Sequence, residues 1–259
     1  MAFKKLKLWF DEELAQMLIS KIQEVYSKFS DQRFAQYISS RIDTLELKDR
    51  VEVFADAFHQ EWKDDYQTGV QILLQILGPE NEKETGMFTD FYWVMPIAKY
   101  VEKYGLNHYD LSMHAIEEIT KMNTGEYTIR PYLEQYPKEA LIQMKMWSKS
   151  NNSHVRRLSS EGVRPRLPWA NKLDAYIKNP KPIIPILNQL KDDPSKYVQK
   201  SVANCLNDIL KDNYEIGQGL IEKWQAKSIG KERKWIIKHA LRTLDKKKDP
   251  WAMNLRSSL

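Results

Sequence analysis

Apolar residues recur at intervals of three and four along almost the whole chain, which is the spacing of amphipathic helices. The clearest apolar stripe comprises Leu14, Met17, Leu18, Ile22, Val25, Tyr26 and Phe29. Acidic residues at positions 11–13 precede this stripe, where a helix N-terminus favours negative charge. No segment alternates strictly between apolar and polar residues, as a half-buried strand does. The pattern therefore predicts an all-α protein.

Cap and turn residues divide this pattern into short helices. Ser30-Asp31 is typical of a helix start, Gly78-Pro79 of a helix end, and the polar stretch 80–86 of a loop. Pro96 either kinks a helix or marks its start, because proline lacks the N–H that an interior turn needs. Further helices are expected over residues 34–42, 50–62, 66–77, 109–122, 129–135 and 137–148.

The second half of the sequence repeats itself weakly. The run Val155-Arg156-Arg157-Leu158 is echoed 43 positions later by Val198-Gln199-Lys200-Ser201, and a looser echo begins at Trp235, 37 positions further on. A period near 40 with two helices per unit is typical of HEAT-like repeats, which stack into an α-solenoid with a concave binding face. We expect about six such units in one domain, because no Gly/Ser-rich linker interrupts residues 1–259. Its expected parts are N-terminal repeats over 1–120, repeats carrying the functional residues over 121–245, and a C-terminal tail over 246–259.

Composition excludes several classes of protein. The single cysteine, Cys205, rules out a disulfide framework, and the five histidines lack metal-ligand spacing, so we expect no metal and no cofactor. No window approaches the roughly 20 apolar residues of a membrane span, and the N-terminal segment lacks an export signal. We therefore expect a cytoplasmic protein that does not contact membranes, and we expect it to be a monomer. The net charge of +5 is modest, so the distribution of charge matters more than its total.

The stretch from residue 152 to 170 is the most unusual part of the sequence. Its nineteen residues contain four arginines, one carboxylate and one indole. A helix that begins near Ser153 places Arg157 and Glu161 on one face, and Pro165 and Pro168 then end the helix. Three of the side chains would follow on a rigid extended loop, namely Arg164, Arg166 and Trp169. This arrangement predicts a site for anions and for a flat group.

Three segments resemble the AlkC branch of the bacterial DNA alkylation-repair glycosylases: Ser153–Ala170, Asn123–Tyr132 and Ser201–Asp208. The resemblance implies a monofunctional glycosylase of base excision repair. Such an enzyme hydrolyses the N-glycosidic bond of cationic methylated bases in duplex DNA, such as 3-methyladenine and 3-methylcytosine, without flipping the base. The resemblance also implies that carboxylates and an indole lie against the sugar of the damaged nucleotide. The matching positions are Glu126, Glu161, Asp208 and Trp169.

These residue types suit that chemistry. A base alkylated on a ring nitrogen leaves as a neutral molecule, so the cationic sugar is the difficult species, and a neighbouring carboxylate would stabilise it and orient the attacking water. An indole face adds about 0.5–2 kcal/mol of cation–π attraction, a rate effect of at most about thirtyfold. Cations would neutralise DNA phosphates without reading the sequence. The candidates for this role are Arg130, Arg156, Arg157, Arg164, Arg166 and Lys200.

Each candidate also has a plain structural interpretation. Arg157 and Glu161 could form an ordinary surface ion pair, Trp169 could fill the core between repeats, Glu126 could cap a helix, and Asp208 could be an exposed helix residue. Related branches with the same fold bind DNA without glycosylase activity, so a non-catalytic protein that recognises bent or branched DNA is one alternative. A repeat protein that grips acidic protein partners is another.

Overall fold

The computed structural model describes residues 4–225 and 228–259, and within these ranges its regular elements are helices. Residues 1–3 lie outside the described part. They belong to the N-terminal segment in which we expect no export signal. The prediction of an all-α protein is confirmed. The chain forms two compact units, Met1–Pro131 and Tyr132–Leu259, which are described separately below. The expected single domain with its three parts therefore stays a prediction.

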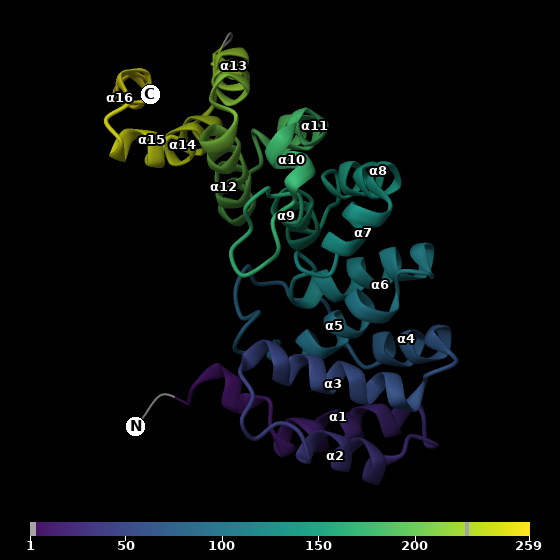
Figure 1. Cartoon of the computed structure of the whole chain (residues 1–259). Coiled ribbons are helices and arrows are strands. Elements are labelled where there is room, and N and C mark those ends of the chain that lie inside the picture. Colours follow the sequence, from purple (N-terminus) through teal and green to yellow (C-terminus); the bar gives the residue numbers. More distant parts are fainter. Residues whose placement is uncertain (1–3, 226–227) are drawn as a thin grey trace. The chain divides into compact units, whose positions relative to one another are not determined.

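The first unit is built from six helices of nine to fifteen residues and two 3-10 turns (Figure 1). Their bounds are η1 (Leu6–Trp9), α1 (Glu12–Val25), α2 (Asp31–Ser39), α3 (Leu47–Glu61), α4 (Tyr66–Gln75), η2 (Tyr92–Val94), α5 (Met95–Tyr104) and α6 (Tyr109–Met122). A short helix, α7 (Arg130–Gln135), crosses the boundary between the units. The core of the first unit is aromatic: Phe34 stacks on Phe58 with ring centroids 5.1 Å apart, and Tyr100 packs edge-on against Phe58.

The helix boundaries of the first unit follow the predicted caps. The side chain of Asp11 accepts a hydrogen bond from the backbone N–H of Leu14, and Ser30 does the same for Arg33. Pro96 lies in the first turn of α5, so it starts this helix and does not kink it. One expectation was wrong: Val25, assigned to the apolar stripe, is 42% exposed because α1 ends there.

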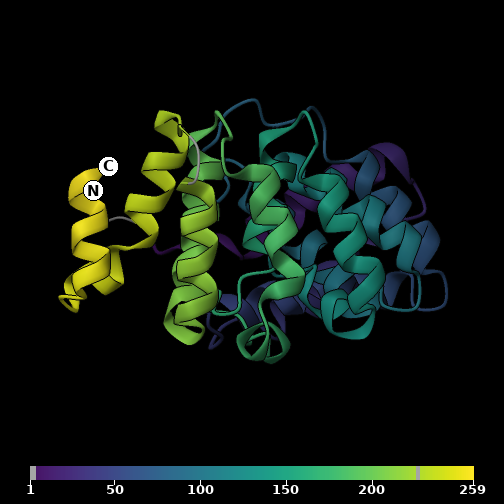
Figure 2. The same cartoon turned by 90° about the horizontal axis from the view of Figure 1, so that it is seen from above.

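The second unit contains the predicted repeats. Its helices are α8 (Pro137–Trp147), α9 (Ser153–Glu161), α10 (Asp174–Lys178), α11 (Ile184–Leu190), α12 (Lys196–Asp212), α13 (Tyr214–Gln225), α14 (Lys231–Ala240), α15 (Arg242–Lys246) and α16 (Pro250–Ser258), with the 3-10 turn η3 (Lys181–Ile183). The three segments that echo one another in sequence lie in α9, α12 and the second half of α14, and α12 packs against both of the other helices. In Figure 2 the helices of this unit, coloured from teal to yellow, follow one another in sequence order. The echo therefore marks equivalent helices of neighbouring repeats.

The last fourteen residues include a helix, whereas the sequence suggested a tail. The carboxylate of Asp249 caps α16 by accepting a hydrogen bond from the backbone N–H of Ala252. Arg256 donates to Asp245 at 2.6 Å and so links α16 to α15. Among the described residues, no helix combines the length and the apolar content that crossing a bilayer requires.

Candidate functional site

Helix α9 begins where the sequence indicated. Asn152 caps it, and its side chain accepts hydrogen bonds from the backbone N–H groups of His154 and Val155. Val155 and Leu158 are fully buried, so the face that carries Arg157 and Glu161 is turned away from the apolar core. The helix ends at Glu161, and a loop follows over residues 162–169. Pro165 and Pro168 both lie in this loop, after the end of the helix.

The loop after α9 is anchored by buried side chains. Val163, Pro165 and Leu167 are buried, whereas Arg166 is half-buried, and the backbone N–H of Leu173 donates to the carbonyl of Pro165 at 3.1 Å to close the loop. The loop therefore has a fixed inner row of apolar residues. Its outer end is free to present polar or aromatic side chains.

Trp169 lies at the outer end of this loop. Its side chain is 74% exposed, so the alternative that it fills the core between repeats is wrong. Its φ is +62°, in the left-handed region, where a bulky residue is rare and costs roughly 1–3 kcal/mol. Core packing therefore does not explain why a tryptophan occupies this position.

Two of the predicted carboxylates meet around one guanidinium. Arg164 Nη1 donates to Glu161 Oε1 at 2.6 Å, and Arg164 Nε donates to Asp208 Oδ2 at 2.9 Å. All three side chains are buried, with 5% of Glu161, 7% of Arg164 and 2% of Asp208 exposed. Arg164 was expected on the outside of the loop, and that expectation was wrong. The interpretations of Glu161 as a surface residue and of Asp208 as an exposed helix residue are also wrong.

Surrounding cations keep Glu161 ionised. Burial alone raises the pKa of this carboxyl, but the guanidinium groups of Arg157 and Arg164 and a hydrogen bond from Ser201 outweigh burial and hold the pKa below its ordinary value. The same attraction from Glu161 and Asp208 overcomes the desolvation of Arg164 and raises its pKa. Glu161 and Arg164 are therefore both charged at neutral pH.

The other arginines of the stretch are engaged within the second unit. Arg156 forms a two-point ion pair with Asp193, and Arg166 forms one with Asp212, with nitrogen–oxygen distances of 2.7–3.2 Å. Arg157 Nη2 lies 3.7 Å from Glu161 Oε1, and its guanidinium stands over the ring of Tyr197. Lys200, on α12, is exposed. Each arginine of the 152–170 stretch thus has an acidic partner within the protein. The number of arginines in the sequence therefore does not measure the positive charge available to a ligand.

Two further residues belong to the surroundings of this cluster, and neither was predicted as a site residue. Ser201 donates to Glu161 and also lies 2.7 Å from the Ser160 hydroxyl. Arg242, at the start of α15, lies near enough to Arg164 and Asp208 for their charges to affect its pKa. Ser201 falls within one of the segments that carry the family resemblance, whereas no sequence signal distinguishes Arg242 from other surface arginines.

Glu126 and Arg130 belong to the first unit. Both are buried, and Glu126 Oε2 accepts a hydrogen bond from the Thr124 hydroxyl at 2.7 Å. The structure thus brings together Glu161, Arg164 and Asp208 within the second unit. The grouping of Glu126 with Glu161, Asp208 and Trp169 stays a prediction.

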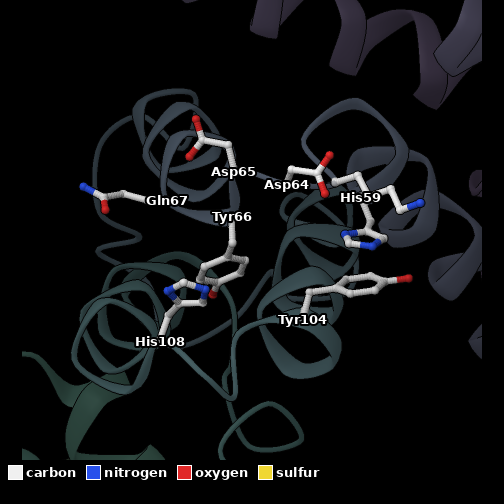
Figure 3. Close-up of a pocket in the computed structure, with 8 residues that line it drawn as sticks. His59, Asp64, Asp65, Tyr66, Gln67, Tyr104 and His108 are labelled. Carbon is white, nitrogen blue, oxygen red and sulfur yellow. The ribbon is translucent and has the colours of Figure 1, made fainter.

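The first unit also contains a pocket of about 310 Å³ (Figure 3). Two histidines and two tyrosines line it in stacked pairs: His59 on Tyr104, with ring centroids 3.8 Å apart, and His108 on Tyr66, at 4.8 Å. None of the residues predicted for the functional site lines this pocket. Across the described residues, no group of three or more histidine, cysteine or acidic side chains is arranged to hold a metal ion.

The chain is similar in sequence and in structure to known proteins. A family model described as "DNA alkylation repair enzyme" matches residues 46–244. The chain is 37% identical over 254 residues to the "Uncharacterized protein YhaZ" of Bacillus subtilis (strain 168), covering 96% of this chain and 67% of that protein. It is also similar to the structure of Pseudomonas fluorescens alkylpurine DNA glycosylase AlkC bound to DNA containing an abasic site analog. That similarity has a TM-score of 0.88 at 33% identity, over 98% of this chain and 68% of the other.

Proposed function

Because this chain belongs to the DNA alkylation repair enzyme family, we propose that it is a DNA glycosylase that hydrolyses the N-glycosidic bond of alkylated bases in duplex DNA. The proposed substrates are cationic bases, 3-methyladenine and 3-methylcytosine, and the proposed mode leaves the base unflipped. The observation that carries the proposal is the buried pair of carboxylates, Glu161 and Asp208, held by Arg164 in the second unit.

The proposed chemistry needs charge beside the sugar more than it needs proton transfer to the base. An N-alkylated base already carries positive charge and leaves as a neutral molecule, so no general acid is required. Glu161 stays ionised, because its pKa is below its ordinary value, and would stabilise the positive charge that develops on the sugar. Asp208, or Glu126 from the first unit, would orient the attacking water.

Trp169 would lie against the same nucleotide. Its exposed indole offers a flat face to which a cationic sugar is attracted. A flat exposed surface does not require the base to leave the stack, which avoids the few kcal/mol of unstacking that base flipping costs. Selectivity would then come from the charge and lability of the damaged base.

The first test is base release from a methylated duplex by the full chain. We expect free 3-methyladenine and 3-methylcytosine in the soluble fraction, and we expect Glu161→Gln and Asp208→Asn each to slow release at least about 100-fold, the effect of removing one preorganised electrostatic group. Both substitutions keep the size of the side chain, so circular dichroism should show an unchanged helix content. Release that stays at the unsubstituted rate in both variants would remove these residues from the mechanism.

One observation favours a second candidate function, DNA binding without catalysis. Arg164 neutralises the same two carboxylates that would have to stabilise the sugar cation, and Arg157 and Lys211 add further positive charge nearby. Under this alternative, the protein binds duplex DNA in a salt-sensitive manner and releases no base from any alkylated substrate. The release assay separates the two candidates, because only the glycosylase forms free bases.

A further inference from the structure

Part of helix α12 forms a row of polar residues that begins at the carboxylate cluster. Lys196, Lys200, Asn204 and Asp208 are spaced four residues apart, so each lies close to one helical turn from the next. Lys200 is two helical turns from Asp208, about 12 Å along the helix axis. Both lysines are exposed. The row thus changes from acidic at the buried cluster to basic at the other end of α12.

Arg242 lies beside this row in a fixed orientation. Its Nη2 donates to Asn204 Oδ1 at 2.9 Å, and its Nη1 donates to the backbone carbonyl of His239 at 2.8 Å. Among the ion pairs of the described residues, none joins Arg242, Lys200 or Lys196 to a carboxylate. These cations therefore differ from Arg156 and Arg166, whose charges are compensated by aspartates.

Two stacked rings on α14 lie among these cations. Trp235 and His239 are parallel, with ring centroids 4.8 Å apart, and Lys196 Nζ stands 3.4 Å from the centroid of the Trp235 ring. Burial lowers the pKa of His239, and the charges of Arg242, Lys200, Lys196 and Arg256 lower it further, to about 4. Three acidic groups act on the cations of this cluster: Glu232 acts on Lys196, Asp208 acts on Arg242, and Asp245 is paired with Arg256. The local potential is therefore positive, and an anion there would relieve it.

We infer that Arg242, Lys200 and Lys196 form a phosphate-binding subsite for the DNA backbone, and that Arg242 is the member with a fixed orientation. This inference rests on the proposed function, because it takes the carboxylate cluster as the place of the damaged nucleotide. One strand carries a phosphate for each 3.4 Å of duplex axis, so the roughly 12 Å between Asp208 and Lys200 corresponds to about three or four nucleotides. The subsite would hold the backbone beside the lesion and leave the reacting sugar to Glu161 and Asp208.

The test is the salt dependence of duplex binding, measured by fluorescence anisotropy with the full chain and a short unmodified duplex. Each phosphate contact contributes about 0.9 to the slope of log K against log salt concentration. We expect Arg242→Gln and Lys200→Gln each to reduce the slope by about 1, and the double variant by about 2. Lys223→Gln is the matched control: Lys223 is an exposed cation of the same unit on α13, outside this cluster, and the slope should not change.

The outcomes separate this inference from the proposed glycosylase activity, because an unmodified duplex offers no base to release. A reduced slope in a chain that releases no methylated base supports the subsite and overturns the glycosylase. An unreduced slope in the double variant overturns the subsite even if methylated bases are released. As a second readout, NMR titration should show a higher pKa for His239 with duplex than with inorganic phosphate at the same phosphate concentration. Equal values would mean that the cluster takes any free phosphate, which would also overturn the inference.

Discussion

Two groups of cations in the second unit differ in their surroundings. The arginines of the 152–170 stretch are paired with acidic side chains: Arg156 with Asp193, Arg164 with Glu161 and Asp208, and Arg166 with Asp212. The cations of α12 and α15, Lys196, Lys200 and Arg242, have no such ion pairs among the described residues.

A run of arginines does not by itself identify a phosphate-binding surface. A guanidinium that already has a carboxylate partner must lose that partner, or share it, before it binds a phosphate. A guanidinium held only by an amide oxygen and a backbone carbonyl keeps its full charge for a ligand. The availability of a cation thus depends on residues far away in sequence.

The largest expected effect comes from removing the buried cation. Arg164→Met leaves Glu161 and Asp208 buried without their shared partner, which we expect to cost about 3–5 kcal/mol of folding free energy. Urea denaturation followed by circular dichroism measures this cost. Adding Glu161→Gln and Asp208→Asn to Arg164→Met should recover part of the stability, because the uncompensated charges are then absent. If Arg164→Met unfolds at the same urea concentration as the unsubstituted chain, the cluster does not stabilise the fold.

A smaller effect is expected at a paired cation nearer the surface. The side chain of Arg166 is 36% exposed, so Arg166→Gln should lower stability by less than about 1 kcal/mol despite its two hydrogen bonds with Asp212. The same variant should reduce the salt slope of duplex binding less than Arg242→Gln does, because Asp212 already neutralises Arg166. If Arg166→Gln and Arg242→Gln reduce the slope equally, the ion pair with Asp212 does not prevent Arg166 from binding DNA.

A separate effect is a pH dependence at His239. Its pKa is about 4 in the folded chain, against an ordinary value of 6.5, so the unfolded chain binds more protons between these two values. The contribution of His239 to stability is therefore fully present above pH 6.5 and is lost as the pH falls toward 4. Urea denaturation at a series of pH values should show a shallower loss for His239→Asn. An identical loss in both proteins would mean that the surrounding cations do not act on this ring.

Local features of the fold could be predicted from sequence because they depend on neighbouring residues. Asp11, Ser30 and Asn152 cap helices through hydrogen bonds that span two or three residues, and Pro96 lies in the first turn of α5. The repeat was also visible, because equivalent positions of α9, α12 and α14 need similar apolar residues to stack. The predicted HEAT-like fold and the resemblance to the AlkC branch are confirmed.

The site was only partly predictable. The family resemblance selected Glu161 and Asp208, and the structure brings these two residues together, whereas their catalytic roles stay a prediction. The resemblance could not show that Arg164 lies between them, because the contact joins residues 44 positions apart. For Arg242 there was no signal, since its hydrogen bond to Asn204 spans 38 positions.

The sequence by itself determined which segments are helical, where most of them start, and which helices are equivalent, because helix periodicity and capping act over a few residues. Tertiary structure alone decided which charges are buried against each other and which face outward. The physical reason is that the free energy of a charged side chain depends on its distance to opposite charges and on its exposure to water. Both quantities arise only when α9, α12 and α14 are packed together.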